Sequence, residues 1–105
     1  MKLEEVKEIV KLLQSKGWAD IKLRTKIKES AGSFDIVANS KGVLKKSMLV
    51  IISTDIYDAQ IAIMLLDGVP KKYHKVIYLE EGDPFFVEHP DDIKIITKVD
   101  DFPHP

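Results

Sequence analysis

The chain has 105 residues, which is enough for one domain with a single hydrophobic core. Its hydrophobic fraction of 45% and charged fraction of 31% are those of an ordinary globular protein, and a net charge of −1 argues against a strong general nucleic-acid binder. Cysteine is absent, which excludes disulfides, thiolate metal sites and a cysteine nucleophile. No apolar run reaches the roughly 18 residues that cross a membrane, and the N-terminus lacks a signal-peptide core, so we expect a cytoplasmic protein with no membrane partner.

Residues 3–16 predict an amphipathic helix. Apolar side chains recur every three or four positions from Leu3 to Leu13, and Gly17 follows as a stop signal. At about 100° of turn per residue, Glu5 lies on the flank of the apolar stripe. Glu5 is therefore the acid of this helix that we expect nearest to a sheet.

Residues 20–29 alternate between apolar and cationic side chains, which predicts a strand. One face is then apolar, and the other carries a row of four cations, namely Lys22, Arg24, Lys26 and Lys28. Such a row can contact nucleic-acid phosphates. The row is also typical of a solvated edge strand whose lysines discourage aggregation, and this is the interpretation that we favour.

Two further strands are predicted over residues 33–39 and 48–53, joined by a connection that holds Lys45 and Lys46. The strand at 33–39 pairs with 20–29 as a hairpin and has a single carboxylate, Asp35. The strand at 48–53 is continuously apolar, which is typical of a strand covered on both faces.

A second helix is predicted over residues 55–67, where Asp55 is suited to the N-cap and Asp58 lies in the first turn. The helix is apolar almost all round, so we expect it to be buried in the core or to form half of a homodimer interface. A strand at 76–79 follows, and the strand–helix–strand order indicates a parallel pair.

The C-terminal third predicts an extended piece at 85–87, an edge strand at 93–99 and a loose tail over 98–105. Together these elements predict one α/β domain over residues 1–105, with a central mixed sheet of four or five strands flanked by two helices.

The order helix, hairpin, apolar strand, helix, strand resembles the PD-(D/E)XK nuclease superfamily, and within it the archaeal Holliday-junction-resolvase and Mrr-like branch. In that family an acid on the first helix, an Asp opening one strand and a (D/E)-x-K ending the next hold a divalent metal. Residues 32–38 are similar to the segment with the Asp, here Asp35, and residues 48–54 to the following strand. The resemblance spans residues 3–80, makes Glu5 the candidate helix acid, and implies a restriction-endonuclease-like fold.

The chain departs from the family where the second acid and the lysine belong, because it reads Ile51-Ile52-Ser53. A divalent metal needs several hard oxygen ligands, and Asp35 with Glu5 supplies too few. A shifted register would bring in Asp55 or Asp58, but both are explained as helix-start residues. The catalytic candidates are thus vestigial, and no resident metal or other cofactor is expected.

Three hypotheses follow for the function. The first is a catalytically degenerate nuclease-like domain that acts as an assembly module or binds DNA or RNA through the four strand cations with Lys45 and Lys46. The second is a protein-interaction module, homodimeric through helix 55–67, with no nucleic-acid role. The third is an endonuclease dependent on Mg²⁺ or Mn²⁺, which would use Glu5, Asp35 and a third ligand that the sequence does not reveal.

Overall fold

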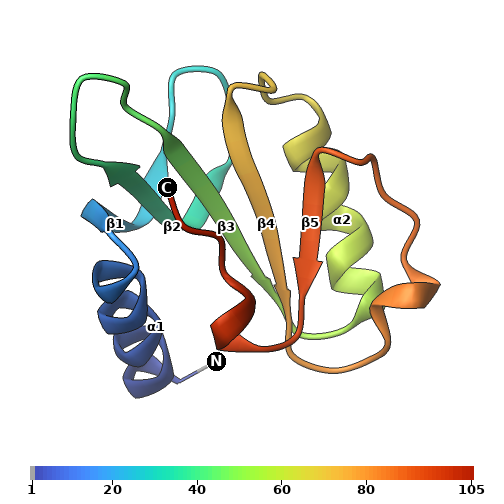
Figure 1. Cartoon of the computed structure of the whole chain (residues 1–105). Helices are drawn as coiled ribbons and strands as arrows, with labels where there is room; N and C mark the ends of the chain where they lie inside the picture. Colours follow the sequence, from blue (N-terminus) through green and yellow to red (C-terminus); the bar gives the residue numbers. More distant parts are fainter. Residues whose placement is uncertain (1) are drawn as a thin grey trace.

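The computed structural model describes residues 2–105, so Met1 of the expected domain lies outside the described residues. The protein is an α/β domain with two helices and one mixed five-stranded sheet, as predicted (Figure 1). In chain order the elements are α1 (Leu3–Ser15), β1 (Trp18–Lys26), β2 (Ser33–Ser40), β3 (Ser47–Ser53), α2 (Ile56–Asp67), β4 (Tyr73–Leu79), the 3₁₀ turn η1 (Pro84–Phe86), β5 (Ile93–Ile96) and the 3₁₀ turn η2 (Val99–Asp101).

The strands lie in the sheet in their order along the chain, from β1 to β5. The pairs β1–β2 and β2–β3 are antiparallel, whereas β3–β4 and β4–β5 are parallel. The parallel pairing of β3 with β4 confirms the expected strand–helix–strand unit, because α2 returns the chain to the end of the sheet at which β3 begins. The β5 strand lies at an edge of the sheet, as its alternation predicted.

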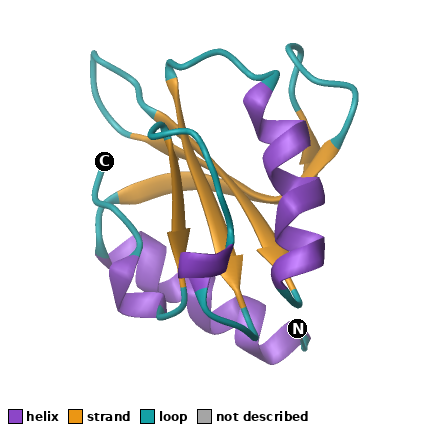
Figure 2. Ribbon diagram, turned by 90° about the vertical axis from the view of Figure 1, so that its right-hand side faces the viewer, coloured by secondary structure: helices purple, strands orange, loops and turns teal. Residues whose placement is uncertain are grey.

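The two faces of the sheet are covered by different elements. Figure 2 shows α2 on one side of the sheet and the C-terminus on the other. Helix α2 buries Ala59, Ala62 and Leu66 in one apolar cluster, while α1 buries Ile9 and Leu13 in a second cluster. Residues of β3 alternate between the clusters, which explains its continuous apolar sequence.

The alternation predicted for β1 is wrong in one important respect. Ile21 packs on the α1 side of the sheet and Ile27 on the α2 side, although one shared face was expected. The cause is backbone geometry, because Asp20 (φ 44°) and Arg24 (φ 49°) adopt left-handed conformations and the register shifts between Ala19 and Lys22. Each such irregularity rotates the side chains that follow it to the other face.

The expectation of a loose tail over residues 98–105 is also wrong. Phe102 is only 2% exposed and stacks on Tyr78, with ring centroids 5.9 Å apart. The indole Nε1–H of Trp18 donates to the carbonyl oxygen of Pro103 over 2.8 Å, and Lys16 Nζ donates to the carbonyl oxygen of Phe102 over 2.6 Å. The tail therefore closes the α1-side core.

Several boundaries differ from their predicted positions. The β1 strand covers Trp18–Lys26 instead of 20–29, and β5 ends at Ile96 instead of at residue 99. The β4 strand begins at Tyr73 rather than at residue 76, and residues 84–86 form the 3₁₀ turn η1 instead of an extended piece. Asp83 caps that turn, because its carboxylate accepts a hydrogen bond from Phe85 N–H over 2.9 Å. Within the part of the chain that the structure describes, neither helix has the length and apolar character needed to span a membrane.

Candidate functional site

Asp35 lies where β2 leaves its regular pairing. Its neighbours Phe34 and Ile36 belong to opposite apolar clusters although they are two residues apart, so the strand changes face at Asp35. On β1, Thr25 pairs with Phe34 and Leu23 with Ile36, which places Arg24 at the level of Asp35. The two chains of the hairpin thus change face together at this level.

The Asp35 carboxylate is engaged by the backbone of β3. Its Oδ2 accepts a hydrogen bond from Ile52 N–H over 2.7 Å. Regular pairing of β2 with β3 runs only as far as Ile36 opposite Val50. Beyond the end of this ladder, the Asp35 side chain accepts the hydrogen bond from Ile52 N–H. In a continuing ladder, a backbone carbonyl of β2 would accept that bond.

Asp35 opens onto a hollow of about 520 Å³ between α1, the β1–β2 hairpin and the ends of β3 and β4. This Asp35 hollow is lined by Leu3, Val6, Leu23, Arg24, Asp35, Ile52, Thr54 and Glu80. It combines an apolar wall with one guanidinium and two carboxylates, a lining that suits a binding site more than a packed core.

Glu80 is a residue of the hollow that the sequence analysis missed. It directly follows β4, and its N–H donates to the carbonyl oxygen of Ser53 at the end of β3 over 2.9 Å. Parallel strands bring their carboxyl ends to one edge of a sheet. From its position directly after the predicted strand 76–79, Glu80 could therefore have been predicted to lie next to Ser53.

Glu5, the candidate helix acid, does not line the Asp35 hollow. It borders a separate hollow of about 330 Å³ whose other residues are Glu8, Ile9, Leu12, Tyr78, Val99 and Asp100. Burial raises the pKa of Tyr78, and the nearby carboxylates of Glu80 and Glu5 raise it further. The structure places Glu5 beside Tyr78, and it does not join Asp35 in one pocket.

The residues at the Asp35 hollow do not fit a divalent metal. Among residues 2–105 no group of three or more histidine, aspartate or glutamate side chains could hold a metal ion. Where the resemblance would place the second acid and the lysine, the chain has Ile51 and Ser53, and Ser53 is fully buried. Hard oxygen ligands are needed there, and an aliphatic side chain supplies none.

Asp55 and Asp58, the substitutes that a shifted register offered, are occupied at the start of α2. Asp55 accepts a hydrogen bond from Asp58 N–H over 2.9 Å, and Asp58 accepts one from Thr54 N–H over 3.0 Å. Asp55 thus satisfies one free donor of the first helical turn, and Asp58 holds the residue that precedes the N-cap. The interpretation of both acids as helix-start residues is confirmed.

The six cations predicted to bind nucleic acid are exposed, yet they do not form the expected row. Lys22 pairs with Val37, whose side chain lies on the α2 side of the sheet. Thr25 pairs with Phe34, which lies on that same side, and Lys26 is the next residue after Thr25. Cross-strand partners share a face and neighbours along a strand do not, so Lys22 and Lys26 lie on opposite faces. Lys28 lies beyond β1, and Lys45 and Lys46 belong to the β2–β3 loop.

Helix α2 is buried on one side only. Tyr57, Ile61 and Met64 are exposed, and so are Phe85 and Phe86 of η1, which adjoins the start of α2. We call these five residues the α2 face. The helix is therefore not enclosed in the core, which was one of the two expectations for it, and several of its large apolar side chains remain exposed.

Comparisons with known proteins add no relative to this geometry. No protein-family model, no curated protein and no solved structure matches the chain.

Proposed function

We propose that this protein is a non-catalytic cytoplasmic module of nuclease-like architecture, which works by assembly and not by cleavage. The observation that supports the loss of chemistry is the pairing of Asp35 with the Ile52 N–H. The one acid that matches the family's strand motif holds the backbone of the next strand, and that strand has Ile51 in place of a second acid. Two-metal hydrolysis requires more oxygen ligands than remain here.

Incubation with branched, duplex and single-stranded DNA and with RNA, in Mg²⁺ or Mn²⁺, tests this part of the proposal. We expect every strand to remain intact. Cleavage by the wild-type chain that disappears in Asp35→Ala would overturn the proposal and establish the metal-dependent nuclease. Cleavage that survives in Asp35→Ala would be traced to a contaminant.

The assembly partner that we propose is a second copy, bound through the α2 face. Tyr57, Ile61 and Met64 follow the spacing of one helical stripe and all three are exposed. The stripe is nearly symmetric about Ile61, so two antiparallel copies of α2 present the same surface to each other across a twofold axis. No lysine or arginine occurs between residues 47 and 70, so this helix has no cation that would be buried by pairing.

The magnitudes favour an interface larger than the helix stripe. Full burial of one such side chain contributes about 1.5–3 kcal/mol, while association costs roughly 4–15 kcal/mol. The three helix residues of two copies approximately offset that cost. Phe86 lies beside the start of α2 and contacts the exposed ring of Phe85, and we expect these two rings to supply the surplus.

Light scattering across a concentration series up to about 100 μM measures this association. We expect a dimer for the wild-type chain and a monomer for Ile61→Glu, because a charge at the centre of the stripe cannot be buried unpaired. Gln14→Glu is the control, since it adds the same charge at an exposed position of α1, outside the α2 face. A wild-type monomer, or a dimer that persists in Ile61→Glu, would refute assembly through this helix.

Nucleic-acid binding is the second candidate function. It is favoured by the exposure of all six residues of the β2–β3 loop, which include Lys41, Lys45 and Lys46. DNA or RNA contact through the β1 cations alone is less well supported, because Lys22 and Lys26 point to opposite faces of the sheet.

A further inference from the structure

The register of the parallel strands brings two lysine pairs together at one edge of the sheet. Lys45 and Lys46 directly precede β3, and Lys71 and Lys72 lie just before β4. Ser47 of β3 pairs with Tyr73 of β4, so the two segments enter the sheet side by side. Neighbouring strands are about 4.8 Å apart, which makes the two pairs close neighbours.

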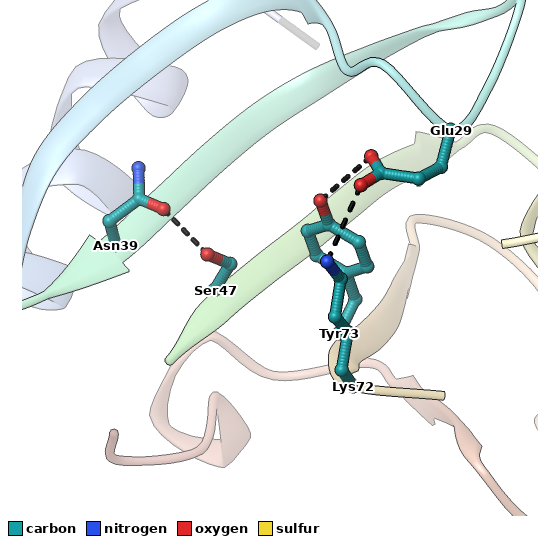
Figure 3. Close-up of polar contacts among 5 residues, drawn as sticks. All are labelled: Glu29, Asn39, Ser47, Lys72 and Tyr73. Atoms are coloured by element: carbon teal, nitrogen blue, oxygen red, sulfur yellow. Dashed lines mark hydrogen bonds and ion pairs between the residues drawn. The ribbon is translucent and has the colours of Figure 1, made fainter. Parts of the chain in front are cut away.

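The β2–β3 loop is anchored at its base and projects beyond the sheet. Ser40 N–H donates to the Lys46 carbonyl oxygen over 2.8 Å, and Lys46 N–H donates to Ser40 Oγ over 2.8 Å. One step further down, the Ser47 hydroxyl donates to Asn39 Oδ1 over 2.6 Å (Figure 3). Figure 1 shows this loop and the α2–β4 loop along the same upper edge of the molecule.

We call Lys41, Lys45, Lys46, Lys71 and Lys72 the lysine edge. All five side chains are exposed. Between Asp35 and Asp55 the sequence contains no acidic residue, so neither the β2–β3 loop nor β3 has a negative charge of its own.

Two acids of neighbouring elements face the lysine edge. Glu29 lies 3.4 Å from Lys72 Nζ and accepts a hydrogen bond from the Tyr73 hydroxyl over 2.9 Å (Figure 3), and these contacts, the Tyr73 bond first, lower its pKa. Asp92 is bound to Lys75 and is influenced by Lys71 only as a smaller effect on its pKa. Five cations against these two acids, one of which is already paired elsewhere, leave the edge positive.

The tip of the same loop carries two aliphatic side chains that nothing in the described fold covers. Val43 is 101% exposed and Leu44 is 85% exposed. Gly42 has a φ of 112°, and a Cβ there would meet no atom within 4 Å, so the tip stands clear of the rest of the chain. An apolar tip framed by lysines fits a polyanion that also has apolar surface.

We propose that the lysine edge binds the sugar-phosphate backbone of nucleic acid, with Val43 and Leu44 pressed against sugars or base edges in the minor groove. Lysines supply the phosphate contacts, and aliphatic wedges of this kind are used at minor grooves. This site goes beyond the assembly role. It lies at the opposite end of β3 from the Asp35 hollow, because β3 begins at Ser47 and the hollow is lined by Ile52 and Thr54.

A nucleic acid suits this edge better than a lipid surface does. Insertion into a bilayer depends on buried apolar area as well as on charge, and only one of the two loops has apolar side chains at its tip. In the α2–β4 loop, Lys71 and Lys72 lie between Pro70 and Tyr73. A charged backbone that runs along the edge contacts the lysines of both loops.

Fluorescence anisotropy with labelled duplex DNA, single-stranded DNA and duplex RNA tests the proposal. With four or five phosphates contacted, affinity is expected to fall roughly 100-fold or more between about 50 and 200 mM salt. Lys45→Glu combined with Lys71→Glu is expected to weaken binding at least about 100-fold, since each reversal removes one contact and adds repulsion. Val43→Ser combined with Leu44→Ser should weaken binding while leaving the salt dependence unchanged.

The control is Lys7→Glu combined with Lys11→Glu, which changes the net charge equally at exposed positions of α1. It should retain affinity within about threefold, because screening limits the effect of distant charges. If both double variants lost affinity equally, binding would depend on the net charge of the protein and not on the lysine edge, and the proposal would be overturned. Absence of binding at low salt, or binding by the edge to anionic phosphatidylserine vesicles and to no nucleic acid, would overturn it as well.

The same experiment separates this site from the proposed dimer. Ile61→Glu is expected to prevent dimerisation and keeps every residue of the lysine edge. The nucleic-acid affinity of this variant, measured by anisotropy, therefore reports on the lysine edge alone. Light scattering of the Lys45→Glu, Lys71→Glu variant should give the wild-type mass. Failure of the dimer therefore leaves the nucleic-acid site standing, and failure of the site leaves the dimer standing.

Discussion

Asp35 and Ile52 are joined by a hydrogen bond of 2.7 Å between a side-chain carboxylate and a backbone N–H, at the point where regular β2–β3 pairing has ended. The bond closes the gap that the change of face at Asp35 opens between the strands. It also places the carboxylate at the wall of the hollow and not free within it.

Asp35→Ala is therefore expected to lower stability. It leaves the Ile52 N–H without its acceptor, at a cost of about 1–2 kcal/mol in the free energy of unfolding. Asp35→Asn keeps an acceptor oxygen at the same place and should cost less than half as much. Urea denaturation measures both, and amide hydrogen exchange at Ile52 should accelerate in the alanine variant only. Equal stability of wild type and Asp35→Ala would show that the bond contributes nothing.

The sequence was sufficient for those parts of the fold whose signals are local. Helix α2 begins and ends within a residue of its prediction, because Asp55 is a good N-cap and Gly68-Val69-Pro70 follows the last turn. The mixed sheet followed from the order of strands and helices. These signals depend on a few neighbouring residues, so tertiary contacts did not need to be known.

The parts that failed depend on backbone conformation or on distant partners. Asp20 and Arg24 adopt left-handed backbone conformations. Glycine at these positions would have indicated such a conformation in the sequence, whereas aspartate and arginine do not. The docking of the tail depends on Trp18 and Pro103, which lie 85 residues apart. Glu80 was within reach of sequence reasoning, whereas the bond from Ile52 to Asp35 was not, because a change of face within a strand has no residue pattern of its own.

Phe102 tests whether the C-terminal segment is part of the core. Phe102→Ala should destabilise the protein by about 3–5 kcal/mol, because a fully enclosed ring leaves a cavity against Tyr78. Val43→Ala, at a fully exposed position, should change stability by less than about 0.5 kcal/mol. Thermal denaturation followed by circular dichroism compares the two. Equal melting temperatures for the two variants would mean that the tail is loose after all.

Gly82 and Gly42 form a matched pair for the contact between the β4–η1 turn and α2. Both have positive φ, 105° and 112°, but a Cβ at Gly82 would lie 2.8 Å from Ile56 Cγ2, whereas one at Gly42 meets nothing within 4 Å. Each alanine substitution should cost about 1 kcal/mol for the left-handed backbone. Gly82→Ala should cost roughly 1–3 kcal/mol more through overpacking. Chemical denaturation measures the difference, and equal losses would show that Ile56 moves aside freely.

The ion pair of Lys75 with Asp92 gives the protein a defined response to acid. Lys75 Nζ lies 2.9 Å from Asp92 Oδ2, with the lysine side chain 1% exposed and the aspartate side chain 26% exposed. The hydrogen bond from Lys75 holds the pKa of Asp92 below its ordinary value of 3.8. A carboxyl group whose pKa is lowered by folding stabilises the folded state above its unfolded pKa, and that contribution is lost as the pH falls through the folded pKa.

Asp92→Asn should therefore cost about 1–3 kcal/mol at neutral pH, because a buried ammonium is left with a weaker, uncharged acceptor. The exposure of Asp92 to solvent keeps the cost below that of a fully enclosed pair. The difference from wild type should be constant at neutral and mildly acidic pH and should shrink below the ordinary aspartate value of 3.8. Asp91→Asn, at the exposed neighbouring position, is the control and should match wild type throughout. Urea titrations from neutral pH down to about pH 2.5 cover this window. A stability difference that does not shrink in acid would mean that Asp92 acts through packing and not through its charge.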